Sequence, residues 1–256
     1  MAVRESRDGL LGAAAAALGA RGNHADRADG RGDELIATAF EFRRRFWIIF
    51  ALFAVAFTCY FVDRTNVIAA TLDGADAVYR AAFAAAAVVA FTAAAIRTWA
   101  SAYLRSEVVK DPAVRTERLV ADGPYRHVRN PLYLGTWLLA VAFAPLASRL
   151  GAVVLVVGMA TIVLRLIGRE EQALLATQGE AYRAYLAAVP RLVPALRPRV
   201  PRGGGVPRWG QAFAGEAMMW AMAVGLTAFA VTFDGRVLYA AVGLGLLSYT
   251  IGRRRA

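Results

Sequence analysis

Long apolar blocks constrain the fold of this chain more than any other feature of its sequence. Six stretches carry almost no charge and approach the twenty or so residues with which a helix crosses a hydrocarbon core of about 30 Å. We expect these helices at 46–62, 77–99, 132–147, 151–168, 212–232 and 236–251. Because hydrophobic residues make up 58% of the chain, an ordinary soluble domain is excluded. The sequence therefore predicts an all-α fold, a polytopic membrane bundle of about six transmembrane helices.

Arginines predict the orientation of this bundle. They gather at 43–45, 101–131, 165–208 and 253–255, and the alternation of hairpins assigns all four regions to one side. The positive-inside rule makes that side the cytosol, so we expect a multi-pass protein of the inner, cytoplasmic membrane with both termini cytosolic. The net charge of +11 then needs no nucleic-acid partner, and membrane lipids are the expected partners. Arg80 and Arg97, near the ends of the second apolar stretch, are expected to snorkel to the interfaces. Arg97 also begins the polar connection that follows, so it could instead border the functional site.

The same pattern divides the chain into four parts. Residues 1–45 are expected to be a flexible N-terminal extension or a mis-assigned start, in preference to a cleaved signal. Residues 46–195 form the membrane core, 196–211 a cytosolic connector rich in proline and glycine, and 212–256 a C-terminal transmembrane hairpin with a basic tail.

Two polar stretches interrupt the apolar pattern on the cytosolic side, at 116–135 and 169–194. The first, TERLVADGPYRHVRNPLYLG, combines turn residues with cations and tyrosines, and Asn130-Pro131 reads as an N-cap followed by the first residue of a helix. The free N–H groups of such a helix end attract anions. In the second stretch, Gly179 is expected to end one helix before a short helix over 180–189. We therefore expect the chemistry of the protein in a cytosolic cap built from these two stretches.

The two stretches also carry a family resemblance. GPYRHVRNPLYLG (123–135) resembles the Gly-Pro-Tyr-Arg-x-x-Arg-His/Asn-Pro-x-Tyr-x-Gly signature of the isoprenylcysteine carboxyl methyltransferase and phospholipid methyltransferase family. REEQALLATQGEAYRAYLAAVPRLVP (169–194) is similar to the Glu-Glu, Gly-x-x-Tyr-x-x-Tyr and Val-Pro-Arg pattern of the same family. The resemblance covers about residues 80–195 and leaves the last two spans as an addition.

This resemblance implies an integral membrane methyltransferase that uses S-adenosylmethionine as its cofactor and acts on a lipophilic or small-molecule acceptor. Carried across, the cofactor-binding residues are Tyr125, Arg126, Val128, Arg129, Asn130, Pro131, Tyr133, Gly135, Glu170, Glu171, Tyr182, Tyr185 and Arg191, with Arg129, Glu170 and Glu171 as the catalytic candidates. Asn130 stands where many members have histidine, and His127 stands where tyrosine is common, so no catalytic role is assigned to His127.

The chemistry of the cofactor agrees with these residue types. The carboxylates of Glu170 and Glu171 are suited to the ammonium group or the ribose hydroxyls, and Arg126 and Arg129 to the carboxylate. Tyrosines can stack on adenine or face the sulfonium by cation–π attraction, worth about 0.5–2 kcal/mol each. Methyl transfer requires in-line approach more than acid–base chemistry, so catalysis is expected to rest on positioning and on the exclusion of water.

Other interpretations of the same residues stay open at this point. The arginines also suit lipid phosphates, the glutamates also suit ion pairs with nearby arginines, and the tyrosines also suit an interfacial belt. The whole chain is also compatible with a sterol-reductase-like membrane enzyme that binds NADPH, or with a non-enzymatic protein that binds anionic lipids. No metal site is expected, because Cys59 is the only cysteine and the two histidines are far apart. A carboxyl, amine, thiol or hydroxyl acceptor, the use of a general base and the oligomeric state all stay open.

Overall fold

The computed structural model describes residues 36–71, 76–104 and 121–254. The chain divides into two units, Met1–Ile36 and Ala37–Ala256, and every helix that the structure describes belongs to the second. Most of the expected N-terminal extension, and the part of the first polar stretch before Ala121, lie outside the described residues.

All regular secondary structure in the described residues is helical, apart from an isolated bridge between Asn66 and Ser148. The predicted all-α fold is therefore confirmed. The elements are α2 (Ala39–Arg43), α3 (Arg45–Thr58), η2 (Cys59–Phe61), α4 (Val67–Thr71), α5 (Asp76–Tyr103), η3 (Gly123–Arg126), α7 (Pro131–Phe143), η4 (Ala144–Leu146), α8 (Arg149–Ala188), α9 (Trp209–Gly215), α10 (Ala217–Thr232) and α11 (Gly235–Arg254).

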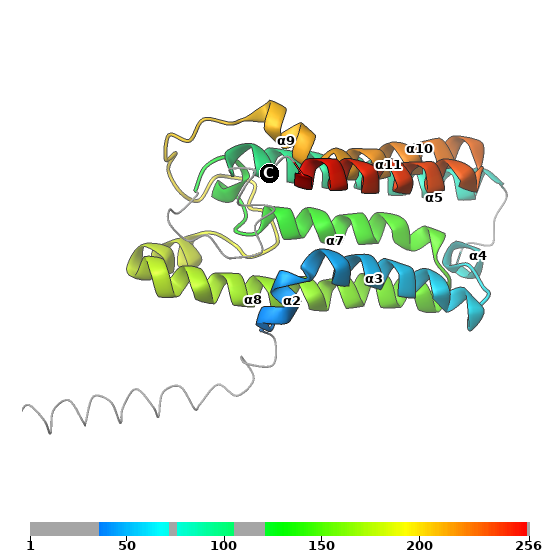
Figure 1. Cartoon of the computed structure of the whole chain (residues 1–256), viewed down its shortest axis with the longest axis horizontal. Helices are drawn as coiled ribbons and strands as arrows, with labels where there is room; N and C mark the ends of the chain where they lie inside the picture. Colours follow the sequence, from blue (N-terminus) through cyan, green and yellow to red (C-terminus); the bar gives the residue numbers. More distant parts are fainter. Residues whose placement is uncertain (1–35, 72–75, 105–120, 255–256) are drawn as a thin grey trace, which may run out of the picture. The chain divides into compact units, whose positions relative to one another are not determined.

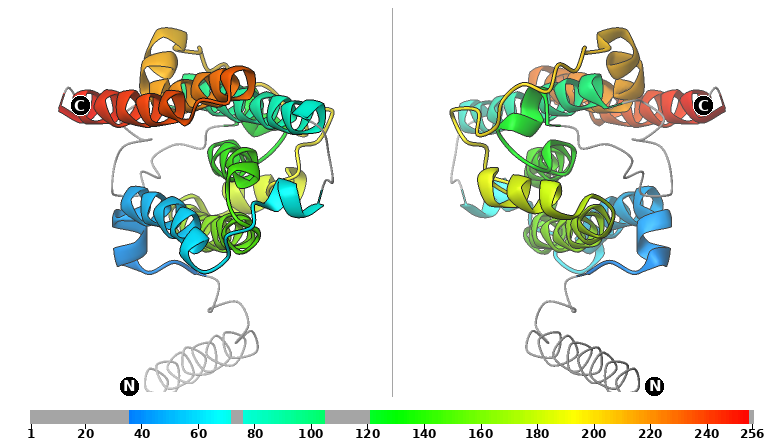
Figure 2. Two further views of the ribbon diagram at one scale, coloured as in Figure 1. Left: turned by 90° about the vertical axis from the view of Figure 1, so that its right-hand side faces the viewer. Right: turned by 90° about the vertical axis from the view of Figure 1, so that its left-hand side faces the viewer.

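The helices of the second unit form layers around α7 (Figure 1). Figure 2, seen along the helices, shows α5, α10 and α11 on one side of α7 and α3 and α8 on the other. Contacts of α7 with both α5 and α8 join the two layers. Since α7 begins at the second half of the first motif, the helix that carries this motif also occupies the centre of the bundle.

Small side chains let α5 and α7 approach closely. Ala90, Ala93 and Ala94 of α5 are completely buried, and they pack in one core with Leu139 and Phe143 of α7. Close approach of this kind gives helices in a bilayer their packing energy, because lipid is as apolar as the side chains themselves. The alanine-rich sequence of α5 is therefore a packing surface.

Six apolar helical segments correspond one for one to the six expected ones. Within the described residues, α5 and α8 are each long and apolar enough to cross a membrane, and α9 with α10 reaches the same standard if the bent pair is one span. Three further segments, Arg45–Phe61, Pro131–Leu146 and Gly235–Leu247, are apolar but shorter. For these three, a full crossing stays a prediction.

The hairpin after the connector differs from its prediction. One continuous helix was expected at 212–232, whereas α9 and α10 are separate and bent by 62°. Glu216, at the break, has non-helical dihedral angles of φ −100° and ψ 13°, and its side chain is buried. The helix breaks where an acidic side chain turns into the protein.

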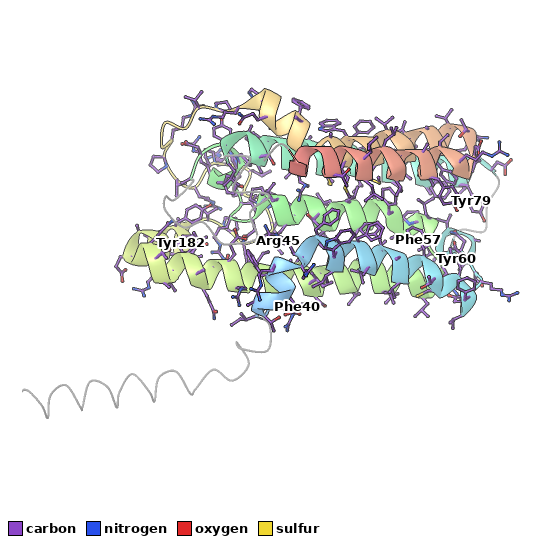
Figure 3. The ribbon with its side chains drawn as sticks, in the orientation of Figure 1. Phe40, Arg45, Phe57, Tyr60, Tyr79 and Tyr182 are labelled. Atoms are coloured by element: carbon purple, nitrogen blue, oxygen red, sulfur yellow. The ribbon has the colours of Figure 1, made fainter. Side chains whose placement is uncertain are left out.

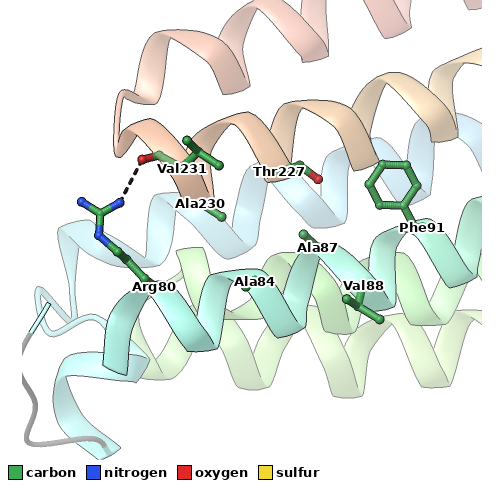
Figure 4. Close-up of a pocket in the computed structure, with 8 residues that line it drawn as sticks. All are labelled: Arg80, Ala84, Ala87, Val88, Phe91, Thr227, Ala230 and Val231. Carbon is green, nitrogen blue, oxygen red and sulfur yellow. Dashed lines mark hydrogen bonds between the residues drawn. The ribbon is translucent and has the colours of Figure 1, made fainter. Parts of the chain in front are cut away.

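A groove of about 430 Å³ separates α5 from α10. Figure 4 shows it running from Arg80 to Phe91, lined by apolar side chains apart from Arg80 and Thr227. Arg80 donates to the Val231 carbonyl at 2.9 Å and covers the Phe233 ring, in keeping with its expected place at an interface.

Candidate functional site

The conformation of the loop before α7 depends on a glycine, because any side chain at this position would displace a neighbouring ring. Gly123 has φ +56°, and a Cβ atom there would lie 2.3 Å from the Tyr103 ring at the end of α5. The 3₁₀ turn η3 can therefore lie directly on α5, which buries Pro124 and Tyr125. This is how the Gly-Pro-Tyr part of the motif places an aromatic ring inside the protein.

The two polar stretches meet at one end of the bundle. The Arg129 backbone N–H donates to the Pro190 carbonyl at 2.9 Å, and its side chain donates to the carbonyls of Leu186 and Val189. The Tyr185 hydroxyl donates to the Tyr125 carbonyl at 2.8 Å. Figure 3 shows Tyr182 at this end and Tyr60 at the other. Residues sixty positions apart thus form one junction.

Glu171 holds this junction together. Its Oε1 accepts from Arg129 Nε and from Asn130 Nδ2, each at 3.1 Å, and its Oε2 lies 3.1 Å from Arg191 Nη2. Four of the predicted site residues therefore form one cluster. Since both oxygens of Glu171 are engaged, this carboxylate serves the protein's own cations.

Asn130 has a different role from the one expected. It is the N-cap residue of α7, so the predicted helix start is confirmed, but its side chain makes no capping hydrogen bond. The amide instead donates to Glu171 and to the Arg191 carbonyl at 3.2 Å. The side-chain amide therefore joins α7 to the second stretch and does not cap the helix.

Glu170, the neighbouring carboxylate, lies in a different environment. The part of α8 before its break at Gly179, residues 149–178, is about 45 Å long and exceeds the hydrocarbon core of about 30 Å, so the second half of α8, from residue 169, extends beyond the predicted span 151–168. Glu170 lies in this second half and accepts a hydrogen bond from Tyr133 of α7. Burial raises the pKa of Glu170, while Tyr133 and the charge of Arg45 oppose the rise. A carboxylate in this setting gains from a cationic ligand.

Three tyrosines surround the junction. Tyr182 and Tyr185 are buried with ring centroids 5.8 Å apart, and the break at Gly179 (φ +54°) sets their short helix against the junction, as predicted for 180–189. Tyr125 is 8% exposed, and its hydroxyl oxygen is buried with no hydrogen-bond partner in the described part of the chain. Burial, and next the charge of Glu170, raise the pKa of Tyr125. A buried hydroxyl without a partner is costly, and a bound ligand can supply one.

The remaining predicted residues pack or hold the connector. Val128 and Pro131 are buried in the core of the loop. Arg126 Nε donates to the Val200 carbonyl at 2.9 Å, and its own carbonyl accepts from Arg199 N. Gly135 leaves room for the Arg97 side chain, because a Cβ atom at position 135 would lie 2.4 Å from Arg97 Cγ. In the structure these four residues therefore have contacts within the protein.

Hydrogen bonds attach the proline- and glycine-rich connector to the loop before α7. The Asp122 carboxylate accepts from Gly203 N at 2.8 Å and from Gly205 N at 2.7 Å. Ala195 N donates to the His127 carbonyl, and His127 Nδ1 lies 2.8 Å from the Ala195 carbonyl. The connector therefore covers the loop that the first motif forms.

A buried ion pair beside the loop was not predicted. Arg97 of α5 was expected to snorkel, but its Nε lies 2.7 Å from Glu216 Oε2, and the two side chains are 19% and 3% exposed. The expectation is wrong because a partner reaches Arg97 from inside the protein. The signal in the sequence was Glu216 itself, the only acidic residue in the apolar stretch 212–232.

Comparison with known proteins adds a family match over part of the chain. Residues 83–176 match the model of the isoprenylcysteine carboxyl methyltransferase (ICMT) family. The matched segment begins in α5, includes η3 and α7, and ends in α8 just after Glu170 and Glu171. No curated protein and no solved structure matches the chain.

Proposed function

We propose that this chain is an integral membrane methyltransferase of the isoprenylcysteine carboxyl methyltransferase kind that uses S-adenosylmethionine, because its segment from α5 to α8 matches the model of that family. Its acceptor is a lipophilic or small molecule that reaches the site from the bilayer or the cytosol. The apolar helices agree with the membrane location.

One observation carries the proposal: where the two motifs meet, a buried hydroxyl has no hydrogen-bond partner among the described residues and lies within the field of a carboxylate. Tyr125 supplies the hydroxyl and Glu170 the carboxylate, and Glu170 is the strongest charge acting on Tyr125. S-adenosylmethionine, when bound, supplies a methyl group on a positively charged sulfur together with an ammonium group. The residues present fit such a group, because the Tyr125 hydroxyl has no hydrogen-bond partner among the described residues and the Glu170 carboxylate offers a negative charge to the ammonium.

Within this proposal the residues divide their tasks. Glu170 attracts the ammonium group of the cofactor, and the Tyr125 hydroxyl oxygen can accept a hydrogen bond from that ammonium. Glu171 keeps Arg129 and Asn130 in place and so sets the shape of the loop, which makes it a positioning residue. Burial of the junction excludes water, and catalysis rests on orientation. The protein's cytosolic orientation belongs to the same proposal.

Incubation of the purified protein in detergent with methyl-labelled S-adenosylmethionine and a lipid extract of the host membranes tests this function. We expect label in the lipid fraction, and its identification names the acceptor. The matched variants are Glu170→Gln and Glu180→Gln, the same change in α8 at a partly buried and an exposed position. Transfer should fall in the first and persist in the second. Saturable binding of NADPH in place of S-adenosylmethionine would instead favour a reductase.

A further inference from the structure

The C-terminal hairpin lies outside the matched segment, yet one of its side chains reaches the site. Glu216 stands at the break between α9 and α10, and it is 2% exposed. The match to the family ends at residue 176, so nothing in the family assignment gives this glutamate a role.

Glu216 is bound on both carboxylate oxygens by α5. Oε2 accepts from Arg97 Nε at 2.7 Å. Oε1 accepts from Arg97 Nη2 at 3.1 Å and from the Ser101 hydroxyl at 2.7 Å. A paired contact of this kind fixes the plane of a guanidinium as well as its position.

The other arm of Arg97 is directed at α7. Its Nη1 donates to the Leu132 carbonyl at 3.1 Å and to Thr136 Oγ1 at 2.7 Å, so it holds the first turn of the helix that carries the motif. Gly135 makes this approach possible, because a Cβ there would lie 2.4 Å from Arg97 Cγ. The motif glycine and the arginine therefore form one contact.

The held turn also carries a site residue. Tyr133 lies between the two α7 positions that Arg97 contacts, and its hydroxyl donates to Glu170. Arg97 and Glu216 are also among the charges acting on the Tyr125 hydroxyl. A continuous line of contacts thus leads from Glu216 through Arg97 and the start of α7 to Glu170.

We infer that Glu216 is a positioning residue of the cofactor site: through Arg97 it orients the first turn of α7, and with it Tyr133 and Glu170. This inference rests on the proposed function. It makes the C-terminal hairpin a functional part of the site that the family core alone does not complete.

A purely structural ion pair is the competing explanation. Breaking a buried pair leaves one charge uncompensated and destabilises the fold, whereas replacing both charges removes that penalty. Glu216→Gln and the double variant Arg97→Gln/Glu216→Gln separate the two roles. For a structural pair, the double variant regains both stability and cofactor affinity. For a positioning residue it regains stability, but the contacts with Leu132 and Thr136 are not rebuilt and the affinity stays low.

The experiment measures the Kd of S-adenosylmethionine for the folded fraction of each variant, the melting temperature, and hydrogen exchange in the first two turns of α7 without cofactor. We expect Glu216→Gln to raise the Kd by about tenfold to a hundredfold, as displacement of a site element does. The double variant should melt near the wild type and keep the raised Kd. Asp63→Asn, which removes an ion-pair partner at the opposite end of the bundle, should leave the Kd unchanged.

Two results would overturn the inference: a wild-type Kd in folded Glu216→Gln, or recovery of the Kd in the double variant. If the wild type itself does not bind S-adenosylmethionine, the proposed function fails, and hydrogen exchange decides the coupling alone. Faster exchange at the start of α7 in Glu216→Gln then supports the coupling, and unchanged exchange refutes it.

Discussion

The two ends of the bundle use polar side chains in opposite ways. At the end with α4, Asn66 donates to the Tyr60 hydroxyl and to the carbonyls of Pro145 and Ala147, and Asp63 pairs with Arg149. These groups join one hairpin to the next. At the motif end, the Arg97–Glu216 pair is more deeply enclosed than the Asp63–Arg149 pair. There, the buried Tyr125 hydroxyl has no hydrogen-bond partner among the described residues.

The two ends also shift the pKa of their carboxyl groups in opposite directions. Hydrogen bonds from Arg149 lower the pKa of Asp63 from 3.8 to about 2, whereas burial raises the pKa of Glu170 above 4.5. An end built for stability satisfies its charges, and a ligand site leaves a charge partly unsatisfied until the ligand arrives. The difference supports the proposal that the motif end is the functional one.

Loss of Glu171 should have the largest effect. In Glu171→Ala, Arg129 and Arg191 lose their shared counter-charge, and a buried arginine without its partner costs about 3–5 kcal/mol. Thermal unfolding in detergent measures the loss, and cofactor binding should disappear with it. Glu180→Ala, on the exposed part of the same helix, is the control and should change stability by less than about 0.5 kcal/mol. An equal loss of stability in Glu171→Ala and Glu180→Ala would mean that the ion pairs of Glu171 do not stabilise the junction.

Gly135→Ala should have the next largest effect. The new Cβ would meet Arg97 Cγ at 2.4 Å and the Ala93 carbonyl at 2.9 Å, so α5 and α7 must separate. Overpacking of this kind costs about 1–3 kcal/mol. Gly210→Ala is the matched control, since no atom lies within 4 Å of its Cβ position and alanine favours the helix. A melting temperature of Gly135→Ala equal to that of the wild type would contradict the close contact.

The pH dependence of stability should distinguish the two ends of the bundle, with a smaller effect than the two substitutions above. The folded state raises the pKa of Glu170, so its stabilising contribution is present below pH 4.5 and is lost as pH rises through the raised value. Relative to Glu170→Gln, the wild type should therefore lose stability as pH rises above 4.5. Over the same range its affinity for a cationic cofactor should increase, because the carboxylate forms.

Asp63 should show the opposite sign. Its lowered pKa gives stability that is present above pH 3.8 and is lost as pH falls toward about 2. Unfolding of Asp63→Asn across pH 2 to 5 measures this. If the stability contributions of Asp63 and Glu170 changed in the same direction with pH, the contrast between the two ends would be refuted.

The connector should give the smallest effect. Asp122→Asn keeps one acceptor oxygen and loses one of the hydrogen bonds from Gly203 and Gly205, at a cost of about 1 kcal/mol. Limited proteolysis should then cut the connector faster while the melting temperature changes little. An unchanged cleavage rate would show that these bonds do not hold the connector on the loop.

Features that depend on neighbouring residues could be predicted from the sequence. The length of the apolar blocks predicted the helices. Asn130-Pro131 predicted the start of α7, and Gly179 predicted the break in α8. The meeting of the two polar stretches followed from the motifs, because a hairpin of two helices returns the chain to the same side. The individual roles of the site residues stay predictions.

Features that depend on distant partners could not be predicted in this way. Arg97 and Glu216 are 119 positions apart, and no local pattern says that a snorkelling arginine has an internal acid to meet. The Asn130 side chain hydrogen-bonds to Glu171 and does not cap its own helix, and this depends on how the two stretches pack. The bend at Glu216 follows from the same pairing, since a regular α-helix through this residue was the local expectation.

The central claim is that the two motif stretches form one cofactor site, and photochemical cross-linking tests it most directly. Methyl-labelled S-adenosylmethionine is bound to the full-length protein in detergent, irradiated and located by peptide mapping. The account predicts label in peptides from both 121–135 and 169–191, competed by unlabelled cofactor and reduced in Glu170→Gln. Label in neither stretch, or label confined to the end with Tyr60 and Arg149, would contradict it.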